Sequence, residues 1–87
     1  MALLDLLGRR WALRVIWELR EGPVTFRELQ ERCGGVSSSV LSQRLAELRE
    51  AGILDGYELT AEGRELFDVF WPLVEWSERW ARRSDPA

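Results

Sequence analysis

The sequence predicts a mostly α-helical domain with a minimal β-hairpin, and three observations support this fold class. Apolar residues recur at the 3.6-residue spacing of helices through most of the 87-residue chain. Two of the helical stretches are separated by the pair Gly34-Gly35, which is typical of a tight turn. Asp55-Gly56 lies between two short apolar runs, a strong signal for a two-residue hairpin. The length fits a single domain over residues 1–87.

The first predicted element is an N-terminal helix within residues 2–20. Its apolar positions fall at helical spacing, at Leu3, Leu7, Trp11 and Val15. Gly8 either bends this helix or separates a short first helix from the rest of it. Gly22-Pro23 ends the helix, because proline cannot continue the hydrogen-bond ladder. In the connector that follows, Val24 is a candidate for a short strand.

A helix-turn-helix is predicted over about residues 26–51. Thr25 and Glu28 have the spacing of a capping box, in which each side chain satisfies a free amide at a helix start. The short helix that follows ends near Cys33. Ser37 is the expected N-cap of a second, longer helix, whose apolar residues keep the helical period at Val40, Leu41, Leu45 and Leu48.

The remaining elements are a truncated hairpin over residues 53–59 and a last helix over about residues 61–82. Thr60 is the expected cap of that helix, which has apolar residues on more than one face. Pro72 lies inside it, where proline removes one backbone hydrogen bond and favours a bend. The order helix, strand, helix, turn, helix, ribbon, helix is that of a winged helix-turn-helix domain.

The composition argues against an enzyme. The chain has no histidine, one cysteine and one tyrosine, so most of the usual nucleophiles and metal ligands are missing. We therefore expect no catalytic residue, no metal site and no cofactor. No apolar run approaches the roughly 18 residues that a membrane span needs, and Asp5 lies where a signal peptide would be basic or apolar. These features predict a cytoplasmic protein without a membrane partner.

The charge of the chain does not by itself indicate nucleic-acid binding, because the net charge is -3 and all 12 basic residues are arginine. The acid excess is confined to residues 51–68, which carry five acids and one arginine. A remote acidic surface lowers the rate and the affinity of DNA binding. It leaves binding possible where arginines and amides face the phosphates locally.

Several motifs occur in the order expected for a known family. The chain resembles the HxlR-type family of bacterial winged-helix transcriptional regulators over about residues 3–80. The resemblance rests on the segments 6–11 (LLGRRW), 26–29 (FREL), 35–45 (GVSSSVLSQRL), 59–64 (LTAEGR) and 75–76 (EW). It implies a DNA-binding transcriptional regulator, with terminal helices that wrap around a partner subunit to form a homodimer. The operator in double-stranded DNA is then expected to be an imperfect palindrome.

The hairpin, or wing, is where the sequence departs from this family. Gly52 and Leu59 are only seven positions apart, so the hairpin is reduced to its turn. The resemblance implies a basic wing tip that reaches phosphates, whereas this remnant offers Asp55 and Glu58. A second interpretation therefore stays open, in which the chain is a protein-interaction module that has lost DNA binding.

The predicted recognition helix carries the candidate base contacts, which are Ser37, Ser38, Ser39, Gln43 and Arg44. The serines supply hydroxyls and free amides, Gln43 can bond adenine bidentately, and Arg44 can reach guanine or a phosphate. Candidate phosphate contacts near helix starts are Arg9, Arg10 and Arg27. The alternative is a serine-rich cap, a solvated polar face and solvated surface arginines.

The resemblance places the dimer interface on the first and last helices, with the candidates Leu3, Leu7, Trp11, Trp71, Trp76 and Trp80. The hydrophobic content of 46% supports a partner subunit, since a domain of this size buries only about 60% of its unfolded surface. Two other interpretations of the tryptophans stay open. They could fill the core, or they could form an aromatic slot for a small hydrophobic effector.

The lone cysteine has two interpretations. Cys33 occupies the last apolar position of the short helix, which favours a core residue. The alternative is a redox switch, since regulators that resemble this chain include thiol sensors, although this sequence lacks a cysteine before the first helix.

Overall fold

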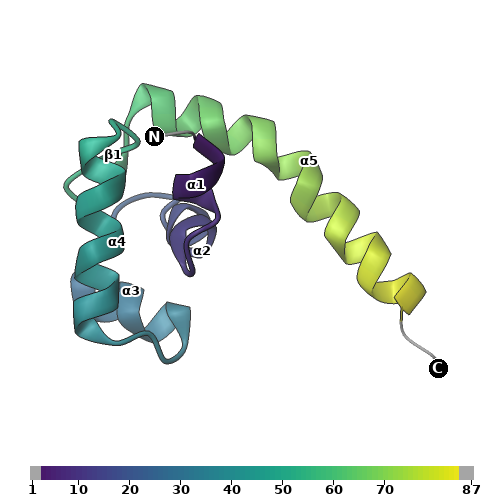
Figure 1. The fold of residues 1–87 in the computed structure, drawn as a ribbon, viewed down its shortest axis with the longest axis horizontal. Coiled ribbons are helices and arrows are strands. Elements are labelled where there is room, and N and C mark those ends of the chain that lie inside the picture. Colours follow the sequence, from purple (N-terminus) through teal and green to yellow (C-terminus); the bar gives the residue numbers. More distant parts are fainter. Residues whose placement is uncertain (1–2, 85–87) are drawn as a thin grey trace.

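The computed structural model describes residues 3–84 as five helices and one antiparallel hairpin. In chain order the elements are α1 (Leu3–Leu7), α2 (Ala12–Glu18), α3 (Phe26–Cys33), α4 (Ser38–Glu50), β1 (Leu54–Asp55), β2 (Glu58–Leu59) and α5 (Ala61–Ser84). The first four helices and the hairpin cluster together, and the second half of α5 extends away from them (Figure 1). The predicted fold class, mostly helical with a minimal hairpin, is confirmed.

The N-terminal segment is two helices rather than one. Residues 8–11 separate α1 from α2, so the second alternative for Gly8 is the one observed. The Gly8 amide donates to the Leu4 carbonyl oxygen at 2.8 Å, and a Cβ at this glycine would lie 2.9 Å from the same oxygen. Trp11, directly before α2, has a φ of 77°, in the left-handed region that non-glycine residues rarely adopt. The backbone therefore turns sharply between the two helices.

The helix-turn-helix is formed by α3 and α4. The predicted cap at Ser37 is present, and the predicted capping box at Thr25 is half formed, because among the described residues the Glu28 carboxylate meets the Thr25 hydroxyl and not a backbone amide. Thr25 Oγ1 accepts a hydrogen bond from the Glu28 amide at 3.1 Å and lies 3.2 Å from the Glu28 carboxylate, to which it donates. Ser37 Oγ accepts from the Val40 amide at 3.2 Å. Gly34 ends α3 in the left-handed conformation, with a φ of 69°.

The hairpin is as short as predicted, because β1 and β2 pair over two residues each. Gly56 makes the turn between them with a φ of 59°. The prediction of a short strand at Val24 is wrong. In the described part of the chain the two strands of the hairpin pair only with each other, which leaves Val24 without a strand partner.

The start of α5 is fastened to the residues before β1. Thr60 Oγ1 donates to the Gly52 carbonyl oxygen at 2.5 Å and accepts from the Gly63 amide at 3.0 Å. The helix backbone passes so close to this segment that a Cβ at Gly63 would overlap the Ile53 carbonyl oxygen. Only glycine fits at this point of contact.

The core lies between α2, α3, α4 and the hairpin, and its largest fully buried side chains are Val15, Ile16, Leu19, Leu29, Leu41, Leu45 and Leu48. In the described part of α5, Phe70 is the one large side chain buried as deeply as a core residue, and Gly63 is buried too. Pro72 lies inside α5 without ending it. The large apolar side chains left exposed lie on α1 and α5: Leu3, Leu4, Val69, Trp71, Leu73, Trp76 and Trp80.

Candidate nucleic-acid interface

One face of α4 is available to a ligand. The helix buries Leu41, Leu45 and Leu48 and exposes a small polar surface on its other side, formed by Ser38, Ser39, Ser42, Gln43 and Ala46. Hydroxyl, amide and methyl groups are the chemistry that reads base edges in the major groove of DNA. Ser42 and Ala46 were missed by the sequence analysis, although their spacing from Ser39 and Gln43 could have indicated them.

The serines at the start of α4 differ in what they can offer. Ser37 Oγ is occupied as the helix cap, and Ser38 Oγ accepts a hydrogen bond from Gln30 Nε2 at 3.1 Å. The same Gln30 amide lies 3.2 Å from the Val36 carbonyl oxygen and therefore ties α3 to the turn. Ser39 is held only by a 3.4 Å contact with Ser37, and Gln43 makes no side-chain hydrogen bond to another residue of the described chain. Ser39 and Gln43, together with the exposed Ser42, are therefore the side chains best placed to meet a base.

Arg44 points elsewhere. Its Nε donates to the Arg10 carbonyl oxygen at 2.9 Å, and its Nη1 forms an ion pair with Glu47. Only 13% of its side chain is exposed. In this structure the guanidinium therefore binds the turn between α1 and α2 rather than projecting from the polar face of α4.

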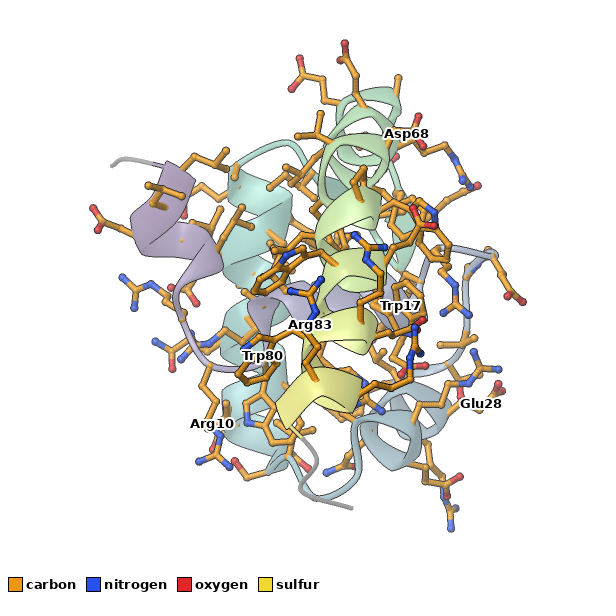
Figure 2. All side chains as sticks on the ribbon, turned by 90° about the vertical axis from the view of Figure 1, so that its right-hand side faces the viewer. Arg10, Trp17, Glu28, Asp68, Trp80 and Arg83 are labelled. Carbon is orange, nitrogen blue, oxygen red and sulfur yellow. The ribbon has the colours of Figure 1, made fainter. Side chains whose placement is uncertain are left out.

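The three predicted phosphate contacts lie in two places. Arg9 and Arg10 lie in the turn beside α4, where Arg9 Nε is 3.1 Å from Glu47 Oε2. Arg10 has no carboxylate within 4.0 Å among residues 3–84, and its guanidinium lies over the Trp11 ring (Figure 2 labels Arg10). Arg27 is on the surface of α3, 3.6 Å from Glu31. The structure thus brings Arg9, Arg10 and Arg44 together and leaves Arg27 apart.

The hairpin remnant exposes both of its acids, Asp55 and Glu58. It also holds a cation that the sequence analysis missed. Arg49, in the last turn of α4, donates from Nε to the Gly56 carbonyl oxygen at 2.9 Å and lies over the Tyr57 ring at 5.1 Å. This arginine attaches the turn of the hairpin to the recognition helix.

The predicted dimer residues are in different environments. Leu7 and Trp11 are partly buried against the core, whereas Leu3 is half exposed. Trp71 stacks on Trp17 of its own chain. Trp76 and Trp80 stack on each other and are about half exposed, at 49% and 54%.

Two hollows lie beside α5, and Trp17 lines the second of them. One, of about 440 Å³, is lined by Arg20, Glu21, Phe67, Asp68 and Trp71. The other, of about 380 Å³ and almost wholly apolar, is lined by Leu13, Arg14, Trp17, Phe70, Leu73, Val74 and Ser77. Figure 2 shows Trp17 and Trp80 on opposite sides of α5. The hollows are the places that fit the predicted aromatic slot.

Cys33 is a core residue, with 3% of its surface exposed. Burial raises the pKa of its thiol; Arg14 opposes this shift and Glu18 adds to it. A raised pKa reduces the fraction of reactive thiolate at neutral pH. The geometry therefore supports the core interpretation of this cysteine.

Comparisons with known proteins agree with this architecture. The family model described as HxlR-like helix-turn-helix matches residues 6–85. The chain is 31% identical to the HTH-type transcriptional regulator YodB of Bacillus subtilis, over 93% of this chain and 82% of that protein. It is 27% identical to the HTH-type transcriptional regulator MJ0925 of Methanocaldococcus jannaschii, over 99% of this chain and 89% of that protein.

Solved structures show the same fold. Quinone-bound YodB from B. subtilis superposes with a TM-score of 0.80 at 34% identity, over 87% of this chain and 91% of that one. A possible HxlR family transcriptional factor from Thermoplasma volcanium superposes with a TM-score of 0.83 at 25% identity, over 94% of this chain and 84% of that one.

Residues 3–84 were also considered for membrane spans and metal sites by their helix lengths and ligand side chains. No helix among them is long and apolar enough to cross a membrane, and they contain no cluster of three potential metal ligands. The relatives are named as transcriptional regulators rather than enzymes, which confirms the predicted class of function. The chain belongs to the HxlR-like helix-turn-helix family of transcriptional regulators.

Proposed function

We propose that the protein acts as a homodimer that binds a palindromic operator in double-stranded DNA. The observation that carries this proposal is the exposed polar face of α4, whose Ser39 and Gln43 side chains are available to base edges. In a helix-turn-helix the N-terminal part of the second helix enters the major groove. Two copies would present their recognition helices about 34 Å apart, or a multiple of that spacing.

The contacts divide by chemistry. Gln43 and Ser39 are the proposed base readers, with Ser37 and Ser38 contributing backbone amides to the phosphates at the helix start. Arg10 and Arg27 are the proposed phosphate contacts, and Arg9, whose side chain is 44% exposed, would join them through the guanidinium nitrogens that do not face Glu47. Arg44 remains one of the proposed residues of the DNA-binding surface, but its hydrogen bond to the Arg10 carbonyl oxygen favours a role other than base reading.

The proposed dimer interface uses the exposed apolar side chains of α1 and α5, above all Trp76 and Trp80. Two stacked indole rings, each about half exposed, form an apolar surface that a second copy would cover. Trp71, Leu3, Leu7 and Trp11 would contribute through the portions that the core leaves accessible.

A small hydrophobic effector is the second proposed ligand, because the apolar hollow beside Trp17 has room for one. YodB has been solved with a quinone bound, which makes a planar effector compatible with the family.

A DNA-bound regulator of this kind would work in the cytoplasm, the compartment that holds bacterial DNA.

A protein-interaction module remains the second candidate function, favoured by the acidic hairpin and by the exposed tryptophans of α5. The two functions differ in their response to salt. DNA binding loses affinity steeply as salt rises, because it depends on the release of counterions from phosphates, whereas an apolar protein interface hardly responds.

The test is selective retention of genomic DNA fragments by the purified protein at moderate salt, followed by binding measurements over a salt series. We expect enrichment of fragments that share an imperfect palindrome, with affinity falling as salt rises. Equal retention of all fragments, together with salt-insensitive capture of a protein, would favour the interaction module.

A further inference from the structure

Glu47 lies between two arginines that come from different parts of the chain. Its Oε2 is 3.1 Å from Arg9 Nε, in the turn after α1, and its Oε1 pairs with Arg44 on α4 itself. Arg44 in turn donates to the Arg10 carbonyl oxygen at 2.9 Å. Side-chain exposure is 19% for Glu47 and 13% for Arg44, so both groups are largely shielded from solvent. Four charged or polar groups therefore form one connected junction.

From this junction we infer that Glu47 and Arg44 are positioning residues, which fix the recognition helix against the turn between α1 and α2. Neither touches a base in this assignment. The inference rests on the proposed DNA-binding function and specifies how α4 is held in the orientation that the groove requires. It replaces the expectation that Arg44 reads guanine.

The charge of Glu47 supports this assignment. A carboxylate on a helix that approaches DNA repels the phosphates and lowers affinity. In our assignment Glu47 offsets this repulsion by pairing with two arginines, Arg9 and Arg44. They join the middle of α4 to the Arg9–Arg10 segment, which is more than 30 residues away in the sequence.

The turn is a suitable anchor because its backbone has few alternatives. Trp11 is held at a φ of 77°, and the close approach of Gly8 to the Leu4 carbonyl leaves no room for a larger residue. The Arg10 carbonyl that receives the Arg44 guanidinium is therefore presented in a defined direction. A non-glycine residue persists at a positive φ only where its surroundings hold it there, so the turn offers Arg44 an ordered acceptor.

The chain offers a matched control for testing Glu47. Glu50 lies on the same helix, is exposed, and has no ion pair within 4.0 Å among residues 3–84. Glu47→Gln and Glu50→Gln each remove one negative charge from α4. If charge alone mattered, both variants would bind DNA as tightly as wild type or slightly tighter. We expect this only for Glu50→Gln, and we expect Glu47→Gln to bind about 3- to 10-fold more weakly.

The readout is DNA affinity across a library of duplex sequences, at a temperature at which circular dichroism shows every variant fully folded. Positioning predicts that Glu47→Gln weakens all sequences by a similar factor and leaves the order of preference unchanged. Arg44→Gln should give the same pattern, and the double variant should be little weaker than either single one, because the two residues act through one junction. Arg44→Lys should not restore affinity, since an ammonium lacks the planar fork that reaches both partners.

Three results would overturn the inference. Glu47→Gln could bind as tightly as Glu50→Gln while only its melting temperature falls, which would make the junction purely structural. Arg44→Gln could change the preference at one base pair, which would make Arg44 a base reader. Wild type that retains no DNA selectively would remove the proposed function and this inference together, whereas the first two results would leave the proposed function standing.

Discussion

The indole rings of Trp17 and Trp71 stack nearly parallel, with centroids 5.3 Å apart and an angle of 5° between their planes. This contact joins α2 to α5, and the Phe67 ring packs against both indoles at 6.0 and 5.8 Å. Trp76 and Trp80 form a separate pair further along α5, with centroids 6.2 Å apart. The tryptophans of α5 therefore belong to two groups. Trp71 stacks on α2 and is 40% exposed, whereas Trp76 and Trp80 stack on each other and are 49% and 54% exposed.

Replacing a tryptophan of either group with alanine should have a different effect, on folding in one group and on association in the other. Trp71→Ala removes a stacked, partly buried ring and should lower the free energy of unfolding by about 1–2 kcal/mol. Trp76→Ala and Trp80→Ala should leave the fold of each subunit intact and weaken association between subunits. Urea unfolding at several protein concentrations separates the two effects, because only a dimer's stability depends on concentration.

Sedimentation of the same variants provides the check on the dimer. Wild type should associate at micromolar concentration, and Trp71→Ala should associate better than Trp76→Ala does. A stable wild-type monomer under these conditions would contradict the dimer and with it the assignment of Trp76 and Trp80.

Base reading and phosphate binding can be separated at Gln43 and Arg10. Gln43→Ala should relax the preference at particular base pairs and cost about 1–3 kcal/mol on the best sequence. Arg10→Ala should weaken all sequences alike and reduce the slope of log affinity against log salt by about one. Both quantities come from binding titrations over a salt series on matched and mismatched duplexes. Identical sequence profiles for wild type and Gln43→Ala would show that another face of α4 reads the DNA.

Local signals in the sequence predicted much of the fold. The caps at Thr25 and Ser37 were predictable because each depends on residues three positions away, and the Asp55-Gly56 turn because it depends on adjacent ones. Val24 was wrongly considered as a strand because strand formation depends on a partner, and the shortened hairpin provides none for it among the described residues. The residues next to Val24 in the sequence do not indicate whether a partner strand lies beside it in the fold.

The candidate site was less predictable than the fold. The exposed polar face of α4 followed from helical spacing, but the direction of the Arg44 side chain did not. That direction is set by the Arg10 carbonyl, which is distant from Arg44 in sequence. The turn at Trp11 lies next to this carbonyl in the chain. The roles of Arg49 and Gln30 were missed for the same reason, since each depends on a backbone carbonyl whose position only the folded chain defines.

Gly63 provides a test of the contact between α5 and the hairpin. A glycine-to-alanine change inside a helix normally stabilises a protein by about 0.4–1 kcal/mol. Here the added Cβ would meet the Ile53 carbonyl oxygen, so we expect Gly63→Ala to destabilise the protein by about 1–3 kcal/mol. Thermal or urea unfolding measures the sign directly. Glu65→Ala, exposed in the same region of the helix, is the control and should change stability by no more than about 0.5 kcal/mol.

The thiol of Cys33 should react slowly in the native protein. Burial raises its pKa, so the thiolate fraction at neutral pH is below that of the unfolded chain and increases only at higher pH. We expect the rate of alkylation at pH 7 to be much lower in buffer than in urea, and to rise with pH in both. Equal rates in the two states would show that Cys33 is accessible and would revive the redox interpretation.

The shortened wing carries two exposed acids, and their effect on DNA binding depends on how near the hairpin comes to the phosphates. We expect Asp55→Asn combined with Glu58→Gln to tighten DNA binding modestly at low salt, because two carboxylates that repel the phosphates are removed. At high salt the effect should vanish, since the Debye length falls from about 10 Å at 0.1 M to about 3 Å at 1 M. Titrations of one operator duplex at both salt concentrations measure the difference.

A second pair of neutralising substitutions tests whether the position of the removed charges matters or only the net charge of the protein. Glu75→Gln combined with Glu78→Gln removes the same two charges from the half of α5 that extends away from the hairpin (Figure 1). If the hairpin faces the DNA without touching it, the Asp55/Glu58 variant should gain more affinity than the Glu75/Glu78 variant. Equal gains would mean that only net charge matters. If the Asp55/Glu58 variant instead binds DNA like wild type at every salt concentration and loses capture of a protein partner, the acidic hairpin is an interaction surface, and the protein-interaction function becomes the better account of this chain.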